Sequence, residues 1–549
     1  MAQTPASQRS EALLLASAED GNGAALGHGP RMRRPSARSV PPMRLPEHRD
    51  MVSLWLARDV LMPAILPPKV RLFFIGALAS ISGLIYGLDT GSIGPLTEMP
   101  QFEAVGGAIT TSSSLQGFFV ASILLSASIS SLCSGYIADK ISRRFGIGTG
   151  ALVIIVGTTL SAASQNMASL FAARLITGIG AGQTVSVASI WLLEVATPDV
   201  RGKLAVMIQF MITIGIMSGY FICYGSQRIP SSLSWRLPFI IQTICAALLA
   251  FSVLAFIPFS PRWLVAHGHE ERAVDVLRQL RGRRDAMHTE EDEIVIQKEL
   301  ADIKASIAAT TLSSGRSASY AELFHKRYRF RTWLGIFFMA CQQLSGIDVI
   351  LYFSPIIFSS TFSGTTATFL ASGVSGIVLV VSTIPAQIWM DKWGRKPTMV
   401  WGGVAMATLF LIIGSLFAAF GDRLPADENG EPRVVLRGGA AKWVVVVCIY
   451  LFIAAFSLSW APVTRIYAGE IMPTRLRSRA AAAQQLANWS SNFFVALIAP
   501  VFLRASPSGP YFLFSGCIVL STIVCVFKVK ETKGKSLEAI AELFEARED

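Results

Sequence analysis

Long apolar runs recur along the sequence and restrict the folds that it can adopt. Each run has about 20 residues, which is enough for one helix to cross the hydrocarbon core of a bilayer. One helix that is apolar on all sides can be buried in a soluble core, but a dozen such helices cannot. Six of the runs are expected near 70–91, 113–138, 146–164, 169–195, 203–224 and 234–257, and six more near 331–359, 366–390, 397–420, 442–470, 478–503 and 510–528. The sequence therefore predicts an all-α membrane protein with twelve transmembrane helices.

Composition supports a membrane protein and argues against other classes. Of 549 residues, 52% are hydrophobic and only 15% are charged, against about 25% charged in soluble proteins. The net charge of +12 suggests loops on the cytoplasmic side rather than a nucleic-acid partner, because such loops collect Lys and Arg. The seven cysteines all fall in apolar stretches, without the spacing of metal ligands, and read as core residues. We expect no metal and no cofactor. The sequence shows no nucleophile–base set and no phosphate-binding loop, so we do not expect an enzyme.

The apolar runs divide the chain into two halves. A polar N-terminal segment rich in Ala, Ser, Pro and Arg precedes them and has no signal peptide, so it is expected to be disordered. Helical periodicity in the charged stretch between the halves is strongest around Glu271–Leu280 and Glu290–Ile307. The expected domains are a tail at 1–69, a first six-helix bundle at 70–260, a helical linker at 261–328, a second six-helix bundle at 329–528 and a second tail at 529–549.

Basic residues in the short loops predict how the chain is oriented across the membrane. If the N-terminus lies inside, the short inner loops carry eleven Lys and Arg, whereas the short outer loops carry only Arg228, Arg236 and Arg504. Cytoplasmic loops are the ones enriched in Lys and Arg. Both tails and the linker are therefore expected in the cytosol, and the protein in the plasma membrane.

The two halves repeat their inner-loop patterns. Gly135–Arg144 follows the second run, and the similar Asp391–Lys396 follows the eighth. In each half an acidic residue also precedes an arginine by seven positions, in the pairs Glu194 and Arg201, and Glu470 and Arg477. Two matched halves are typical of a transporter that rocks about a central binding site.

The seventh run contains polar residues where hydrocarbon is expected. Two amides, a carboxylate and a phenol lie within Gln342–Tyr352, inside a helix expected from about Arg331 to Ser359. Polar groups in such a setting are costly and usually functional. At helical spacing Gln342, Gly346 and Val349 share one stripe. This cluster can exchange hydrogen bonds with a polar, uncharged ligand, and we interpret it as part of a sugar site.

Six further motifs occur in order along the chain. They are Arg174-x3-Gly178-x-Gly180-x-Gly182, Glu194-x3-Pro198-x2-Arg201-Gly202, Pro258-Phe259-Ser260-Pro261-Arg262, Gln342-Gln343-x2-Gly346, Glu470-x2-Pro473-x3-Arg477 and Glu531-Thr532-Lys533-Gly534-Lys535-Ser536-Leu537-Glu538. Over about residues 70–545 the chain resembles the sugar porter family of the major facilitator superfamily, in its fungal or plant-like form. The resemblance implies two pseudo-symmetric six-helix bundles with a cytosolic linker, and sugar–proton symport by alternating access.

The resemblance also implies the residues of a sugar site and of the cytosolic gates. Amides bond sugar hydroxyls, and aromatic faces cover C–H surfaces. The implied sugar contacts are Gln209, Gln342, Gln343, Asp348, Asn488 and Trp489, with Tyr352 as a gate or wall. Ion-pair clamps that hold one state and break in the other are implied for Asp139, Arg143, Glu194, Arg201, Asp391, Arg395, Glu470 and Arg477. The alternative is that these charges only set the topology.

Proton coupling would require a carboxylate in a span. All six histidines lie in the tail or the linker. By resemblance, proton-coupled members have an aspartate at the position of Asp89, and facilitative members often have asparagine. Arg174 is its expected partner. The alternative is a static ion pair that only fixes packing.

Two charged residues depart from the family pattern within one half. Asp348 stands where asparagine is common, and Arg465 where a tryptophan is common. Because an unpaired charge at that depth is costly, the two changes favour an Asp348–Arg465 pair that lines the cavity. Alternatively, Arg465 binds an anionic substrate such as a uronate or quinate. Smaller departures are Ser142 for glycine and Phe259 for glutamate.

The leading functional hypothesis is proton-coupled import of a sugar, either a hexose or a disaccharide such as sucrose. The alternatives are a proton-coupled carrier of a sugar acid or quinate-like anion bound by Arg465, and a sugar sensor that does not transport. A facilitative carrier is a further alternative, which Asp89 argues against. The expected partners are a small-molecule sugar, protons and the lipid bilayer. The sequence indicates no nucleic acid and no obligate protein partner.

Overall fold

The computed structural model describes residues 66–197, 200–281, 290–312, 320–362, 364–389, 392–424, 433–473, 476–534, 540 and 543–544. Nearly all of the predicted N-terminal tail lies outside this part of the chain. Within it, eleven helices are long and apolar enough to cross a membrane, and the pair α2 and α3, bent by 40°, makes a twelfth span. The predicted all-α fold with twelve spans is confirmed.

The first half of the chain forms six spans. Their helices are α2 (Pro68–Ala79), α3 (Ile81–Thr97), α6 (Ser113–Ile141), α7 (Arg143–Ala163), α8 (Met167–Val195), α10 (Met207–Ser226) and α11 (Leu233–Ala255). Four short helices lie between them: η1 (Pro100–Phe102), α4 (Glu103–Gly106), α5 (Ala108–Thr111) and α9 (Arg201–Ala205).

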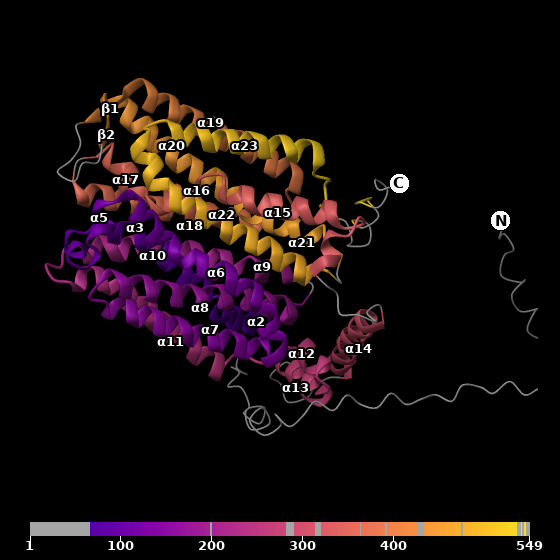
Figure 1. Ribbon diagram of the computed structural model, residues 1–549. Coiled ribbons are helices and arrows are strands. Elements are labelled where there is room, and N and C mark those ends of the chain that lie inside the picture. Colours follow the sequence, from indigo (N-terminus) through magenta and orange to yellow (C-terminus); the bar gives the residue numbers. More distant parts are fainter. Residues whose placement is uncertain are drawn as a thin grey trace, which may run out of the picture. The chain divides into compact units, whose positions relative to one another are not determined.

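The second half forms the other six spans. Its helices are α15 (Arg329–Gln343), α16 (Ile347–Tyr352), α17 (Ser354–Ser359), α18 (Thr365–Trp389), α19 (Arg395–Phe420), α20 (Gly439–Leu458), α21 (Trp460–Glu470), α22 (Arg477–Ala505) and α23 (Gly509–Lys528). A hairpin of β1 (Gly421–Leu424) and β2 (Arg433–Leu436) pairs antiparallel between α19 and α20. In Figure 1 this half, in orange and yellow, lies beside the first half, in indigo and magenta.

The halves meet along two helix pairs, α6 with α22 and α10 with α18. Inside the first half, α3 packs most extensively against α10. Glycines permit this close approach, because a Cβ on Gly87 would lie 2.1 Å from the Ile212 carbonyl oxygen. Small residues let membrane helices bring their backbones together in this way. The packing leaves a polar cavity between the halves.

The seventh span is broken, so the expected continuous helix from Arg331 to Ser359 is wrong. Helix α15 ends at Gln343, and Gly346 takes a φ of +80° before α16 begins. Glycine adopts this left-handed conformation without the strain that a side chain adds. A second break at Phe353 separates α16 from α17. The break also means that Gln342, Gly346 and Val349 do not form one helical stripe.

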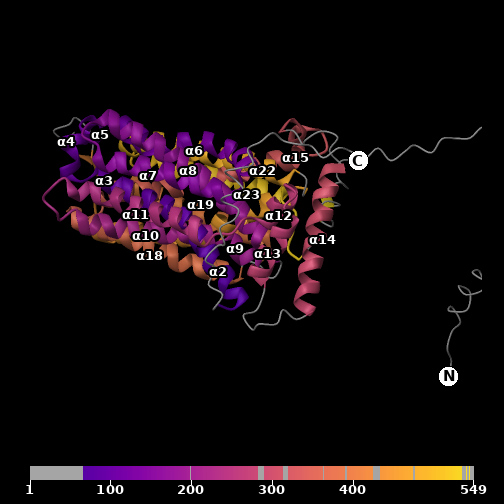
Figure 2. The ribbon, with the colours of Figure 1, turned by 90° about the horizontal axis from the view of Figure 1, so that it is seen from below.

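Three helices of the middle stretch lie at one end of the bundle, which we call the linker end. They are α12 (Pro261–Ala266), α13 (Glu270–Arg281) and α14 (Glu290–Leu312), followed by the short η2 (Tyr320–Phe324). Figure 2 shows them at the end opposite α4 and α5. Arg281 joins the first bundle to α14, since it bonds the Val195 carbonyl at 3.0 Å and pairs with Glu299 at 2.8 Å.

Both smaller departures from the family pattern have visible consequences at the linker end. Ser142 has a φ of +91°, a conformation that favours glycine, and its hydroxyl caps α7 by accepting from the Phe145 N–H. The Phe259 ring lies 5.1 Å from the Arg144 guanidinium. Arg144 also donates to the carbonyls of Val253 and Leu254. A cation–π contact and two carbonyls therefore hold this arginine.

Candidate functional site

A cavity lies between the two halves, with walls from both. Its empty volume is about 720 Å³, a figure that includes open space at its mouth. The lining residues are Tyr86, Thr90, Val185, Gln209, Ile212, Thr213, Ile216, Gln342, Gln343, Ile347, Asp348, Leu351, Leu379, Thr383, Phe456, Ser457, Ala461, Arg465, Gln485, Asn488 and Trp489. Amide, hydroxyl and charged groups thus face the space together with aliphatic and aromatic ones.

The amides of the wall are bonded to one another and to the backbone. Gln342 donates to the Trp460 and Ala461 carbonyls at 3.1 and 3.0 Å and to the Thr464 hydroxyl at 2.9 Å. Asn488 donates to the Gln342 side-chain oxygen at 3.0 Å. Its own oxygen accepts from Gln343, also at 3.0 Å. This amide network of Gln342, Gln343 and Asn488 ties α15 to α21 and α22, so it positions the wall as well as lining it.

The structure brings most of the predicted sugar contacts together. Seven of the eight line the cavity: Gln209, Gln342, Gln343, Asp348, Arg465, Asn488 and Trp489. Tyr352, which was predicted as a gate or wall, is buried and is not among the residues that line the cavity. Its hydroxyl lies 3.3 Å from that of Tyr86, which does face the cavity. The break at Gly346 changes the direction in which the residues after it point.

Asp348 and Arg465 both line the cavity but do not touch. Among the described residues no ion pair within 4.0 Å and no hydrogen bond joins them. They still interact electrostatically. One carboxylate oxygen of Asp348 and the Nε of Arg465 are buried without a hydrogen-bond partner in the described part of the chain. The predicted direct pair is therefore not formed, because the two side chains stand on different helices around one space.

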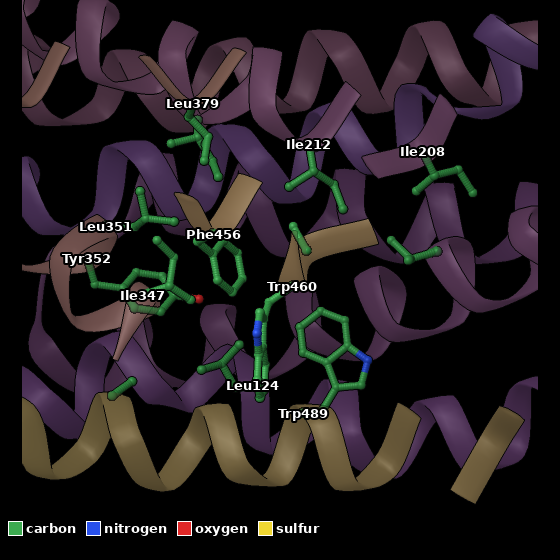
Figure 3. Close-up of a cluster of buried hydrophobic side chains, with 14 of the residues drawn as sticks. Leu124, Ile208, Ile212, Ile347, Leu351, Tyr352, Leu379, Phe456, Trp460 and Trp489 are labelled. Atoms are coloured by element: carbon green, nitrogen blue, oxygen red, sulfur yellow. The ribbon is translucent and has the colours of Figure 1, made fainter. Parts of the chain in front are cut away.

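Aromatic and aliphatic side chains cover the rest of the wall. The rings of Tyr86 and Trp489, from opposite halves, meet edge to face with centroids 4.8 Å apart. In the view of Figure 3, Ile347 and Leu351 of α16 lie on one side of Phe456, and Trp489 of α22 lies on the other. Such surfaces suit the C–H faces of a small polar molecule.

A buried ion pair lies in the first half, outside the cavity lining. Arg174 on α8 pairs with Asp89 on α3, and the two residues are 1% and 3% exposed. Arg174 also donates to the Val120 carbonyl at 3.2 Å. Its guanidinium lies 5.4 Å from the centre of the Phe119 ring. The expected partnership of Asp89 with Arg174 is thus present as a direct contact.

The predicted clamps form ion pairs within each half. In the first half, Arg143 pairs with Asp139 at 2.8 Å and with Glu194 at 3.0 Å. In the second half, Arg395 pairs with Glu470 at 3.0 Å. Arg477 donates to the Met472 carbonyl at 3.3 Å. Asp391 and the side chain of Arg201 lie outside the described residues.

The halves approach closely between the cavity and the end opposite the linker. A Cβ on Gly94 of α3 would lie 1.6 Å from the Tyr352 carbonyl oxygen. The Tyr220 hydroxyl of α10 donates to the carbonyl of Leu351 in α16. A helix break leaves such carbonyls without intrahelical partners. These contacts join the two halves, and they involve carbonyls of the broken seventh span.

Sequence reasoning missed several lining residues. Tyr86, Thr213 and Phe456 were not singled out. The signal available for Tyr86 was its phenol, a polar group in an apolar run. An isolated threonine or phenylalanine in an apolar run gives no such signal.

Two six-helix halves around a central polar cavity define a membrane transporter of the major facilitator fold. The profile of the family described as "Sugar (and other) transporter" matches residues 75–544. The chain belongs to this sugar transporter family, and it is a multi-pass membrane transporter rather than an enzyme.

Relatives from fungi and plants match along most of the chain. A high-affinity glucose transporter 1 of Candida albicans is 30% identical over 492 residues, covering 88% of this chain and 87% of the relative. A high-affinity fructose transporter of Schizosaccharomyces pombe is also 30% identical, with 87% of each chain covered. The sugar transport protein MST3 of Oryza sativa is 27% identical and covers 86% of this chain and 90% of its own.

Solved structures of one bacterial transporter share the fold. The proton:xylose symporter XylE bound to 6-bromo-6-deoxy-D-glucose matches with a TM-score of 0.69 and 26% identity, over 86% of this chain and 99% of that one. XylE from E. coli in a partially occluded inward-open conformation matches with a TM-score of 0.67 and 25% identity. This match covers 85% of the present chain and 99% of the XylE chain.

Proposed function

We propose that the protein imports a sugar across the plasma membrane by alternating access, driven by protons. The observation that carries this proposal is the cavity between the halves, where amides and a carboxylate stand beside the Tyr86 and Trp489 rings. A site built to hydrogen-bond hydroxyls rejects molecules that lack them, because its own buried groups are then left unpaired. Relatives named as glucose and fructose transporters support a sugar substrate.

Asp89 is the proposed proton carrier, with Arg174 as its partner. The pair joins α3 to α8 at a buried position. Relative movement of these helices would separate carboxylate from guanidinium and change which of them is solvated. Since a buried charge without a partner is costly, protonation of Asp89 would accompany the separation. XylE, named as a proton symporter, supports coupling of this kind.

The clamps and the orientation complete the proposed cycle. Arg143 with Glu194, and Arg395 with Glu470, would brace each half at the linker end. We propose that this end and both termini face the cytosol, because the short loops there carry most of the Lys and Arg. The Gly94–Tyr352 approach would then close the outer side while the inner side exchanges substrate.

Uptake by the full-length protein tests the proposal. Expressed in a host that lacks sugar uptake, it should accumulate labelled hexoses, disaccharides or sugar acids, and a protonophore should abolish the accumulation. The Asp89→Asn variant should lose uphill uptake but keep exchange of sugar across the membrane, because the binding cavity is unchanged. Unchanged accumulation in that variant would rule out Asp89 as the carrier. A protein that reaches the membrane and takes up none of these compounds would instead indicate a sensor.

A further inference from the structure

The cavity wall contains polar atoms that the protein itself does not satisfy. Three buried lining atoms have no hydrogen-bond partner within the described residues: a carboxylate oxygen of Asp348, the Nε of Arg465 and the indole nitrogen of Trp489. The Asp348 and Trp489 side chains are nine-tenths buried or more, at 8% and 3% exposure. A buried polar atom without a partner is destabilising. The three atoms are themselves covered by protein, but they belong to side chains that line the cavity and that the protein leaves incompletely bonded.

Two neutral amides of the wall, Gln342 and Asn488, are bonded within the protein. The hydrogens of Gln342 are bonded to Trp460, Ala461 and Thr464, and Asn488 is bonded on both its oxygen and its nitrogen. The polar groups that remain for a substrate include the amides of Gln209 and Gln485 as well as two charged side chains. Among the residues that line the cavity, Asp348 and Arg465 are the charged ones.

The position of Arg465 is fixed by the amide network rather than by Asp348. Helix α21 begins at Trp460, and Gln342 holds the carbonyls of Trp460 and Ala461. One turn further along, Arg465 reaches the cavity. No ion pair or hydrogen bond of Arg465 is present among the described residues. A guanidinium held at the wall of a cavity in a membrane protein, without a carboxylate in contact, is an anion-binding group.

We infer that the substrate is a sugar acid of monosaccharide size, whose carboxylate is bound by Arg465 and whose hydroxyls donate to Asp348. The inference rests on the proposed function and names its substrate class. Guanidinium binds carboxylate through two parallel N–H donors, which gives strength and orientation. Because Asp348 and Arg465 both line the cavity and are not paired, the anionic end and the hydroxyl-bearing end of one molecule can contact them separately.

The charges of the loaded cavity support this assignment. Asp348 and Arg465 together carry no net charge. A sugar acid brings one negative charge, and a proton transported with it brings one positive charge. The loaded carrier then has the same net charge as the empty one, so the intramembrane site does not bear an uncompensated charge. A neutral sugar would leave the guanidinium without an anionic partner in contact.

The test compares two substrates that differ only at C6. Purified full-length protein is reconstituted in liposomes with an inward proton gradient, and initial uptake of labelled D-glucuronate and D-glucose is measured. We expect a preference for glucuronate of roughly 10- to 100-fold, the value of one charge-assisted hydrogen-bond set. Arg465→Trp should lose most glucuronate uptake and shift the ratio toward glucose. Arg465→Lys should keep part of the preference, because it retains the charge without the planar fork.

The matched control is Arg228→Gln, which removes a positive charge from an exposed position bonded to the Tyr224 hydroxyl. Its ratio of glucuronate to glucose uptake should equal that of the wild type. Monodisperse elution of each variant in size-exclusion chromatography verifies folding, and Arg465→Lys keeps the test valid if Arg465→Trp misfolds.

Three results would overturn the inference. Proton-driven glucose uptake without glucuronate uptake would remove the sugar acid and leave the proposed function intact. An equal loss of both substrates in Arg465→Trp and Arg465→Lys, with an unchanged ratio, would show that Arg465 does not select the substrate. Failure of folded wild-type protein to transport glucuronate, glucose or any other sugar tested would overturn both the inference and the proposed function.

Discussion

Two of the opposite-charge combinations in the described helices, Asp89 with Arg174 in the first half and Asp348 with Arg465 in the second, differ in one respect. Asp89 and Arg174 are in direct contact and lie outside the cavity lining. Asp348 and Arg465 face the cavity and make no such contact. The first pair is bonded internally, although the Nε of Arg174 has no hydrogen-bond partner among the described residues. The second pair is not bonded internally and faces a space that another molecule can occupy.

The difference follows from how each pair is held. Arg174 has the Val120 carbonyl and the Phe119 ring around it as well as Asp89. Arg465 is positioned by its helix, whose start Gln342 bonds, and not by bonds to its own guanidinium. A charge enclosed by partners contributes to folding, and a charge that lines a cavity contributes to binding. The stability of variants at the two pairs should therefore differ.

The largest effect is expected from breaking the enclosed pair. Arg174→Met leaves the Asp89 carboxylate buried without its cation, which should destabilise the fold by about 3–5 kcal/mol. Thermal unfolding of the purified protein in detergent measures the loss. The double variant Asp89→Asn, Arg174→Met should recover much of it, because no charge then remains unpaired. Additive losses in the double variant would show that the two residues act independently.

A smaller effect is expected at a carboxylate outside the spans whose partners are backbone N–H groups. Glu531 accepts from the N–H groups of Arg395 and Lys396 at 2.9 and 3.1 Å, at the start of α19. Burial opposes ionisation of Glu531, but these donors and the Lys533 N–H outweigh it, so its pKa lies below the ordinary 4.5. The ionised carboxylate is thus favoured in the folded protein, as expected at a helix N-terminus.

The contribution of Glu531 should therefore depend on pH. Because its folded pKa is depressed, the stabilisation is fully present above pH 4.5 and is lost as the pH falls through the folded value. At pH 7, Glu531→Gln should cost about 1 kcal/mol or less. The difference in unfolding temperature between wild type and Glu531→Gln should shrink as the pH is lowered toward 3.5. A difference that stays constant with pH would assign the effect to packing rather than to charge.

Hydropathy alone predicted the twelve spans, because length and apolarity are local properties that a bilayer requires. It could not reveal the break in the seventh span, since apolar residues continue on both sides of Gly346. The helical stripe predicted for Gln342, Gly346 and Val349 was wrong for this reason, because the left-handed turn at Gly346 interrupts the helical spacing.

The charged residues also show that the sequence does not reveal how distant segments are arranged in space. Departure from a family pattern was enough to identify Asp348 and Arg465 as cavity residues. Whether they touch depends on the distance between α16 and α21, which follows from packing between segments more than 100 residues apart. Sequence gives no measure of that distance, and the predicted direct pair was wrong for this reason.

The smallest effect on stability is expected at this second pair, and it separates the two pairs most clearly. Neither charge has a bonded partner to lose, so Asp348→Asn and Arg465→Gln should each change the free energy of unfolding by less than about 1 kcal/mol, or should stabilise the fold. The coupling between them in a double-mutant cycle should also be small. Unfolding of the single and double variants without substrate measures both quantities. Saturating sugar acid should raise the unfolding temperature of the wild type and not that of Arg465→Gln, because a ligand stabilises only the state that binds it. A loss of several kcal/mol in either single variant would mean that Asp348 and Arg465 support the fold as Asp89 and Arg174 do.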